Sequence, residues 1–432
     1  MSSRKLSSRR HFLAATAAIA AAPYFFTAAH IKADDKPAAS DRLTVGFIGM
    51  GMQSRGHLQW ALNHPQTEVV AICDVHDLRM QDAVDKATKH NAEKNKSGSA
   101  TPVAAYRDFR KLLERDDIDA VVISTPDHWH AIPAILAARS KKHIYCEKPL
   151  SLTIAESRAM VTAARENKVV FQTGSQQRTE FGGHFRKAVE YIRSGRIGKV
   201  KTVRIGVGAA AKPCDLPEEP TPAGVDWDMW NGPSPARGFN QILCPLDIHR
   251  HFPAFRNYKE YAGGMLADMG AHHFDIAQWA LNKDDTGPVE IHPPEQGDTG
   301  LRFVYADGVE MFHGGPSGCT FEGTEGTIYV DRKGIESTPA SILETPLEAS
   351  DFHLPDIGSS HRQNWLDCIR TGEKPVADVE IGARTAQVCQ LANIGYWLRR
   401  PLKWNPKLEE FVDDAEANQL RSRENRAPWN NI

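Results

Sequence analysis

The residue best placed for chemistry in this sequence is a lysine, Lys148, that follows a short β-like run at 143–145. It stands between Glu147 and Pro149. The proline fixes its own φ and disfavours the helical conformation at Lys148, so the lysine is held extended at the mouth of a strand. A lysine in that position beside a carboxylate suits catalysis. The alternative interpretation is a strand-end lysine whose ammonium lies in solvent.

A second group of chemically capable residues lies within segment 261–281. Asp268 and His272 are four residues apart and Asp275 follows three residues later, so the three share one face of a continuous helix. A carboxylate that orients an imidazole is the arrangement that a general base needs. The same spacing is consistent with a polar helix face whose histidines are buried and satisfied.

The elements that must position these residues begin with a dinucleotide-binding pattern. An apolar run at 43–48 leads into a glycine turn and a helix, and a second apolar run ends at Asp74. Gly49 permits the tight turn, and Gly51 lets the backbone approach a pyrophosphate at the helix N-terminus. Ser54 replaces the usual third glycine, a mild departure because serine is also small. Asp74 would bind ribose hydroxyls, which favours NAD, with NADP as the alternative.

Further apolar runs at 120–124, 143–145 and 169–173 complete a doubly wound parallel sheet. The loops that follow such strands face the cofactor crevice. His128 and His130, two residues apart in one of these loops, have a spacing that metal sites use. No third ligand is in view, so we predict no metal and place both histidines beside the nicotinamide.

Beyond residue 179 the pattern changes, because segment 198–205 alternates apolar and polar residues as an antiparallel sheet with one solvated face does. Similar segments follow between 300 and 331. Trp227 and Trp230 are either a sugar-stacking platform or core packing. The predicted domains are a Rossmann domain at 42–178, a C-terminal substrate and oligomerisation domain at 179–402, and a loosely attached polar tail at 403–432.

The totals describe an ordinary soluble globular protein. The chain has 432 residues, 41% hydrophobic and 25% charged, with a net charge of −2, so two domains are expected and nucleic acid is excluded as a partner for want of basic excess. The seven cysteines are scattered and show no C-x-x-C spacing. Neither a disulfide framework nor a zinc site is indicated, which is typical of folding in a reducing compartment.

The N-terminus, by contrast, predicts export. Arg9 and Arg10 form a twin-arginine signature before the alanine-rich stretch 14–22, so we interpret residues 1–33 as a Tat signal and 34–41 as a linker. The alternative is a disordered basic tail. The expected partner is the Tat export machinery, the expected location is the periplasm or cell envelope, and no later apolar run indicates a transmembrane span in the mature protein.

Taken in order, these motifs resemble the glucose–fructose oxidoreductase / inositol dehydrogenase / rhizopine-catabolism (Gfo/Idh/MocA) family, in its exported branch. The resemblance covers roughly residues 42–402 and rests on Gly49-x-Gly51, Thr125-Pro126, Glu147-Lys148-Pro149, Asp268-x-Gly270-x-His272-x-x-Asp275 and the 375–380 segment. It implies an α/β fold, with a Rossmann domain followed by an α+β domain whose sheet is open-faced and mostly antiparallel. Such sheets commonly form oligomer contacts, so a homodimer or homotetramer is expected.

The resemblance also implies roles for individual residues. Lys148 is expected to hydrogen-bond the reacting oxygen beside the nicotinamide and to stabilise the developing alkoxide, His272 to act as acid/base, and Asp268 to orient substrate or base. The cofactor-binding set is Gly49, Gly51, Met52, Gln53, Asp74, Thr125, Pro126, His130, Glu147, Lys148 and Gln176. The substrate-binding set is Arg178, Arg256, Tyr258, Asp268, His272 and His273, with His273 as the alternative base.

The implied function is an NAD(P)-dependent oxidoreductase that transfers hydride between a nicotinamide and a carbinol or keto carbon of a sugar, cyclitol or glycoside. Because free cofactor is scarce outside the cytoplasm, we expect it to be tightly bound. One alternative is an NAD-dependent enzyme that cleaves glycosides by transient oxidation, elimination and re-reduction, although Lys148 favours a conventional dehydrogenase. Another is a non-catalytic sugar-binding protein, which would not need Lys148, Asp268 and His272 together.

Overall fold

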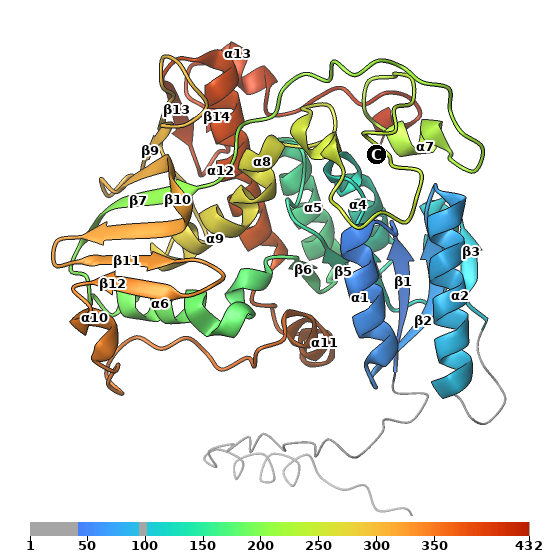
Figure 1. The fold of residues 1–432 in the computed structure, drawn as a ribbon, viewed down its shortest axis with the longest axis horizontal. Helices are drawn as coiled ribbons and strands as arrows, with labels where there is room; N and C mark the ends of the chain where they lie inside the picture. The colour runs from blue at the N-terminus through green and yellow to red at the C-terminus, as the bar shows by residue number, and fades with distance from the viewer. Residues whose placement is uncertain (1–41, 95–101, 432) are drawn as a thin grey trace, which may run out of the picture. The chain divides into compact units, whose positions relative to one another are not determined.

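The structure is a computed structural model that describes residues 42–94 and 102–431. The expected signal segment at 1–33 and linker at 34–41 lie outside the described residues. Within the described chain two β-sheets are joined by helices that pack between them (Figure 1).

The first sheet is parallel throughout, with strand order β3-β2-β1-β4-β5-β6. Its strands are β1 (Leu43–Ile48), β2 (Thr67–Cys73), β3 (Ala104–Tyr106), β4 (Ala120–Ile123), β5 (His143–Cys146) and β6 (Phe171–Thr173). Every residue of β4 is buried, as a strand covered on both faces requires.

Helices cover both faces of this sheet. One core contains residues of α1 (Met52–Asn63) and α2 (Asp77–Lys94), and the other contains residues of α4 (Ala131–Arg139) and α5 (Ile154–Asn167). The doubly wound Rossmann sheet predicted from the glycine turn and the apolar runs is therefore confirmed. The three-residue β3 was not predicted, because so short a strand carries no periodicity.

The second sheet has eight strands in the order β12-β11-β10-β9-β8-β13-β14, with β7 paired to β10. The strands are β7 (Val200–Gly206), β8 (Glu290–His292), β9 (Arg302–Val304), β10 (Glu310–Gly323), β11 (Thr327–Val330), β12 (Ile335–Thr338), β13 (Leu402–Asn405) and β14 (Glu410–Phe411). The long β10 doubles back, so that Met311 and Phe321 both lie opposite Val203.

One face of the second sheet is covered by α6 (His184–Arg193), α9 (Gly270–Ala280) and α12 (Val379–Leu398), which share its core. On β7, Val203 and Ile205 enter this core while Arg204, which lies between them, is exposed. The alternation follows from the two-residue period of a strand. The predicted open-faced, mostly antiparallel sheet is confirmed.

Two C-terminal helices return to the Rossmann sheet. Trp365 of α11 (His361–Thr371) is buried beside β1 and β5, and Val379 and Ala383 of α12 enter the core on the opposite face. The remaining helices are short: α3 (Phe109–Leu113), α7 (Trp227–Asn231), α8 (Gly264–Asp268), α10 (Ser341–Glu344) and α13 (Ala415–Gln419).

The C-terminal segment is not the loose polar tail that its composition predicts. β13 pairs with β8 and β14 with β13, and the last described turn places Trp429 in the Rossmann core at 3% exposure. A few apolar residues in a polar context anchor the segment, because burial depends on where they land and not on average composition.

Among residues 42–94 and 102–431 no helix combines the length and apolarity that a bilayer span requires. The seven cysteines all fall in these ranges and are free thiols. The segment between β7 and α8, which includes α7, passes over the carboxyl end of the Rossmann sheet (Figure 1). It forms one wall of the cavity described next.

Candidate active site

The glycine turn between β1 and α1 leaves room for a phosphate group. Gly49 has φ of +86°, and a Cβ there would lie 2.9 Å from the backbone of Ser124 and Thr125. A Cβ at Gly51 would meet nothing within 4 Å, so the turn is open on that side. Gly51 caps α1 without a side-chain hydrogen bond, and the first turn holds no acidic residue. The free N–H groups and the helix dipole therefore favour an anion here.

Asp74 ends β2 and holds the turn in place. One carboxylate oxygen accepts from the amide of Met50 at 2.6 Å and the other from the amide of His76 at 2.8 Å. A carboxylate has about four lone-pair sites, so two remain for hydroxyl donors. These two free acceptor sites of Asp74 suit the hydroxyls of a dinucleotide ribose.

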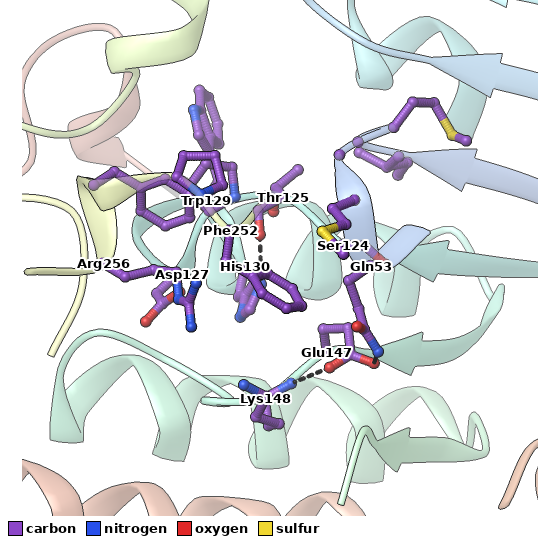
Figure 2. A pocket seen from close by; sticks show the side chains of 18 of the residues that line it. Gln53, Ser124, Thr125, Asp127, Trp129, His130, Glu147, Lys148, Phe252 and Arg256 are labelled. Carbon is purple, nitrogen blue, oxygen red and sulfur yellow. Dashed lines mark hydrogen bonds between the residues drawn. The ribbon is translucent and has the colours of Figure 1, made fainter. Parts of the chain in front are cut away.

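A cavity of about 360 Å³ extends from the glycine turn to Lys148 and His272. Figure 2 shows several of its lining side chains around Lys148. It is lined by every residue predicted to bind the cofactor: Gly49, Gly51, Met52, Gln53, Asp74, Thr125, Pro126, His130, Glu147, Lys148 and Gln176. The hydroxyls of Ser124 and Thr125 on this wall are buried without a hydrogen-bond partner in the protein, so they are available to a ligand or water in the cavity.

His130 joins two loops at the floor of the cavity. Its Nδ1 lies 2.7 Å from the carbonyl oxygen of Pro149 and its Nε2 lies 2.9 Å from that of Thr125, the second contact being visible in Figure 2. Burial lowers the pKa of His130, so the ring is neutral, carries a single N–H and donates to only one of the two carbonyl oxygens at a time. The ring fixes the loop after β4 against the loop that carries Lys148.

Glu147 is the centre of a buried polar network. Its Oε1 accepts from Nε2 of His57 at 2.7 Å and from Nε2 of Gln176 at 2.8 Å, and Gln53 donates to it at 3.2 Å. Nε of Arg362 donates to Nδ1 of His57 at 2.8 Å, which leaves Nε2 as the protonated nitrogen.

This network keeps Glu147 ionised. Burial alone would raise the pKa of Glu147, but the hydrogen bond from His57 and the charge of Lys148 lower it to about 2. The carboxylate thus gives the adjacent Lys148 a fixed negative neighbour, and its Oε2 accepts from the Lys148 amide at 3.2 Å (Figure 2).

Lys148 is held by Asp268 and leaves part of its donor capacity free. Its Nζ donates to Oδ1 of Asp268 at 2.9 Å and to the Asp268 carbonyl oxygen at 3.1 Å, while Arg256 donates to Oδ2 of the same carboxylate. An ammonium has three donors, so one remains for a substrate oxygen. Burial would raise the pKa of Asp268, but the charges of Lys148 and Arg256 lower it to about 2.

His272 faces the same cavity but is not oriented by Asp268, contrary to the interpretation of their spacing. Its Nδ1 is buried without a partner, and Asp268 engages Lys148 and Arg256 instead. The reason is that Lys148 and Arg256 occupy the two carboxylate oxygens of Asp268. Burial and the positive charges of Lys148 and Arg332 hold the pKa of His272 well below its usual value.

Three residues predicted to bind substrate lie outside the cavity lining. Arg178 is 1% exposed and pairs with Asp275 at 2.8 Å and Asp284 at 2.7 Å, so it crosslinks α9 to the core. Tyr258 packs in an aromatic cluster between β7 and α8. His273, the alternative base, points from α9 towards the second sheet, and burial lowers its pKa to about 4. Sequence position alone does not show toward which side such residues turn.

The aromatic pair of α7 belongs to the core. Trp227 and Trp230 stack with ring centroids 4.6 Å apart and an interplanar angle of 11°, and both are buried in that cluster. Trp230 also contributes to the back of the cavity. The alternative of a two-tryptophan sugar platform is thereby excluded for Trp227.

Several cavity residues were not singled out from the sequence. They are Asp127 and Trp129 after β4, Phe252 in the segment before α8, and Arg332 and Arg362 from the C-terminal part. For Asp127 a signal existed, because it follows Thr125-Pro126 at the carboxyl end of a central strand. The two arginines reach the cavity from distant segments, and no local pattern predicts that. Among the described residues no cluster of three or more metal-ligating side chains occurs.

A glycine turn open to a phosphate, an acid at the end of β2 and a lysine–carboxylate–histidine group in one cavity define an oxidoreductase that binds a nicotinamide dinucleotide. Two family models agree: an oxidoreductase family with an NAD-binding Rossmann fold matches residues 43–175, and an oxidoreductase family C-terminal alpha/beta domain matches residues 209–431. The chain belongs to the Gfo/Idh/MocA oxidoreductase family.

Individual relatives are distant. Myo-inositol 2-dehydrogenase of Thermotoga maritima is 24% identical over 391 residues, which are 86% of this chain and 100% of that protein. Glycosyl hydrolase family 109 protein 1 of Shewanella sp. strain ANA-3 is 35% identical over 157 residues, which are 36% of this chain and 33% of that protein. The matched stretch is thus about a third of the latter.

Solved structures share the fold. The aldose-aldose oxidoreductase from Caulobacter crescentus matches with a TM-score of 0.58 at 17% identity, over 84% of this chain and 99% of that one. Levoglucosan dehydrogenase in complex with NADH matches with a TM-score of 0.56 at 19% identity, over the same shares. At these identities the likeness concerns the fold.

Proposed function

We propose that this NAD-dependent oxidoreductase is a dehydrogenase for a hydroxyl-bearing carbon of a sugar, cyclitol or glycoside. The observation that carries the proposal is the position of Lys148 Nζ, 2.9 Å from Asp268 and in one cavity with the glycine turn. The activities for which the relatives are named, inositol and levoglucosan dehydrogenation among them, support a polyhydroxylated substrate.

The cofactor residues fit NAD. The amides at the start of α1 would bind the pyrophosphate, and Asp74 would accept from the ribose hydroxyls. The carboxylate repels the extra phosphate of NADP, which favours NAD. When bound, the nicotinamide supplies the acceptor or donor of hydride.

The side chains can take up the proton of the reacting hydroxyl and stabilise the negative charge that develops on its oxygen. Lys148 donates its free N–H to the reacting oxygen and stabilises the negative charge that grows on it. His272 is neutral at neutral pH because its pKa is depressed, so its ring can accept the hydroxyl proton. Asp268 holds Lys148 in position and keeps it charged, and Glu147 supports the loop from behind.

Redox-neutral glycoside cleavage is the second candidate. It is favoured by the family 109 glycosyl hydrolase relatives, which are 35% identical over their matched stretch. Lys148 is the group that argues for net oxidation. A non-catalytic sugar-binding protein is disfavoured, since Lys148, Asp268 and His272 all face the cavity.

One experiment separates these candidates. The purified protein is incubated with NAD and a panel of cyclitols, free sugars and nitrophenyl glycosides, and the products are identified by mass spectrometry. A keto-sugar with reduced cofactor is expected. Free aglycone without net reduction would support cleavage, and a protein that binds no nicotinamide would refute both enzymatic functions.

We further propose that the protein is exported by the Tat route to the periplasm or cell envelope and works there as a homo-oligomer with a tightly held cofactor. The support is the Arg9-Arg10 pair before an alanine-rich stretch, together with the exposed face of the second sheet. Fusing residues 1–33 to a folded reporter tests export: secretion is expected and should stop when both arginines become lysine. Light scattering tests the oligomer.

A further inference from the structure

Asp127 is a buried carboxylate that lines the cavity and is bonded by no other residue. It follows Pro126 at the end of β4, is 6% exposed and lines the cavity together with Lys148, Asp268 and Arg256. Among the described residues its own amide is the donor to its carboxylate, and no side chain donates a hydrogen bond to it. By contrast Asp74, Glu147 and Asp268 each accept from at least two donors.

The two cations beside Asp127 are already engaged. Lys148 and Arg256 both bond Asp268, so they influence Asp127 through space without pairing with it. Figure 2 shows Asp127 and Arg256 on one side of Lys148, with Glu147 on the other. A carboxylate has about four acceptor positions, so positions that its own amide leaves free can accept from a ligand in the cavity. Asp127 therefore points to a hydroxyl-bearing ligand in the space next to Lys148.

We propose that Asp127 is a specificity-determining residue that accepts a hydrogen bond from a second substrate hydroxyl, on the carbon next to the one whose oxygen Lys148 holds. The proposal rests on the dehydrogenase function proposed above and narrows its substrate class to compounds with vicinal hydroxyls. Lys148 provides a donor for one oxygen and Asp127 an acceptor for the neighbouring hydroxyl. A substrate lacking the second hydroxyl leaves Asp127 unsatisfied, and such sites discriminate strongly.

Protonation of Asp127 gives this interaction a pH dependence. Burial and the negative charge of Asp268 raise the pKa of Asp127 to about 7, against the opposing charges of Lys148 and Arg256. The ionised form is the stronger acceptor. The preference for a substrate with the second hydroxyl over one without it should therefore increase as the pH rises through about 7.

The test compares Asp127→Asn and Asp127→Ala with wild type on myo-inositol, methyl glucosides and the monodeoxy derivatives of both. Loss of the critical hydroxyl should lower kcat/KM of the wild type by about tenfold to a hundredfold, as for a hydrogen bond to a charged group. Asp127→Asn should reduce this difference to below about threefold and abolish its pH dependence. Asp116→Asn, at an exposed carboxylate, is the control.

Binding of the same probes to the NADH-loaded protein, followed by cofactor fluorescence, gives a readout independent of turnover, and circular dichroism checks folding. If Asp127→Asn discriminates as the wild type does, the proposal is wrong. If it weakens NAD binding and leaves discrimination intact, Asp127 serves the cofactor and the proposal is equally wrong. If wild type binds NAD but no polyhydroxylated probe, the dehydrogenase function itself fails, and the vicinal-hydroxyl subsite with it.

Discussion

Lys148 owes its position to three contacts, each from a different part of the chain. Asp268 binds its ammonium, Glu147 accepts from its amide, and Pro149 is tied to His130. The ammonium is therefore held in place before substrate binds. A preorganised donor stabilises a developing alkoxide most effectively, because it need not reorient during the reaction.

Replacing Lys148 by alanine should abolish hydride transfer and spare cofactor binding. Loss of one preorganised donor costs about a hundredfold to a thousandfold in rate, whereas the glycine turn and Asp74 are untouched. Absorbance of the reduced nicotinamide in single turnovers measures the rate, and mass spectrometry of released nucleotide measures occupancy. Lys201→Ala, at an exposed residue near the start of β7, is the control. Retained turnover in Lys148→Ala would remove this residue from its role.

Glu147 gives the fold an acid-sensitive contribution to stability. Its pKa is about 2 against an ordinary value of 4.5, so the unfolded state binds more protons between these values. The contribution is fully present above about pH 4.5 and is lost as the pH falls towards 2, amounting to about 3 kcal/mol. Urea unfolding at several pH values should show a weaker pH dependence for Glu147→Gln than for wild type. The pKa of Asp268 is also lowered, so this residue accounts for part of the pH dependence that remains in Glu147→Gln. Equal slopes of the unfolding free energy against pH in the two proteins would contradict the role of Glu147.

At the scale of elements, the segment before α8 closes the outer side of the cavity. Leu243, His249 and Phe252 line it, and two arginines of the Rossmann helices hold its backbone. Arg79 of α2 donates to the carbonyl oxygens of Pro245 and Asp247, and Arg55 of α1 to that of His249. Because these hydrogen bonds hold the segment over the cavity, we expect the segment to slow dissociation of a bound cofactor.

Detaching this segment should accelerate release of the cofactor. Arg79→Ala removes two backbone anchors without touching the glycine turn, so we expect the NADH dissociation rate constant to rise by about tenfold, with a smaller effect on association. Stopped-flow displacement of bound NADH by excess NAD measures it. Arg139→Ala, at the exposed end of α4, should behave as wild type. An unchanged rate would show that the segment does not retain the cofactor.

The elements that sequence predicts are those whose signal is local. The turn at Gly49 and Gly51, the apolar β4 and the alternating β7 carry their own periodicity, so the Rossmann sheet and the open-faced sheet follow. The partners of Asp268 carry no local signal: Lys148 and Arg256 occupy its carboxylate and leave His272 without it. Arg178 illustrates the same limit: it follows β6 at the predicted cofactor edge, yet it turns to Asp275 because a buried carboxylate there needs a cation.

At the scale of the whole molecule, the two sheets depend on helices and a C-terminal segment that serve both. α12 places Val379 in the Rossmann core and Ile394 in the core of the second sheet. Arg362 of α11 reaches Glu147 through His57. The active site is thus assembled from segments that are distant in sequence, so its geometry depends on the cooperative folding of both layers.

Trp429 tests how far this dependence extends, because it anchors the end of the chain in the Rossmann core. It packs edge-on against Trp129 at 4.8 Å and stacks near Phe109, with Arg110 over its ring at 4.9 Å. Trp429→Ala should lower the free energy of unfolding by about 3 kcal/mol through lost burial and a residual cavity. Since Trp129 also lines the active-site cavity, NAD affinity should fall as well, measurable by titration calorimetry. The exposed Trp397 supplies the matched variant, Trp397→Ala, for which little change in either quantity is expected. Equal stability of the two variants would mean that the C-terminal segment only covers the core and does not hold it.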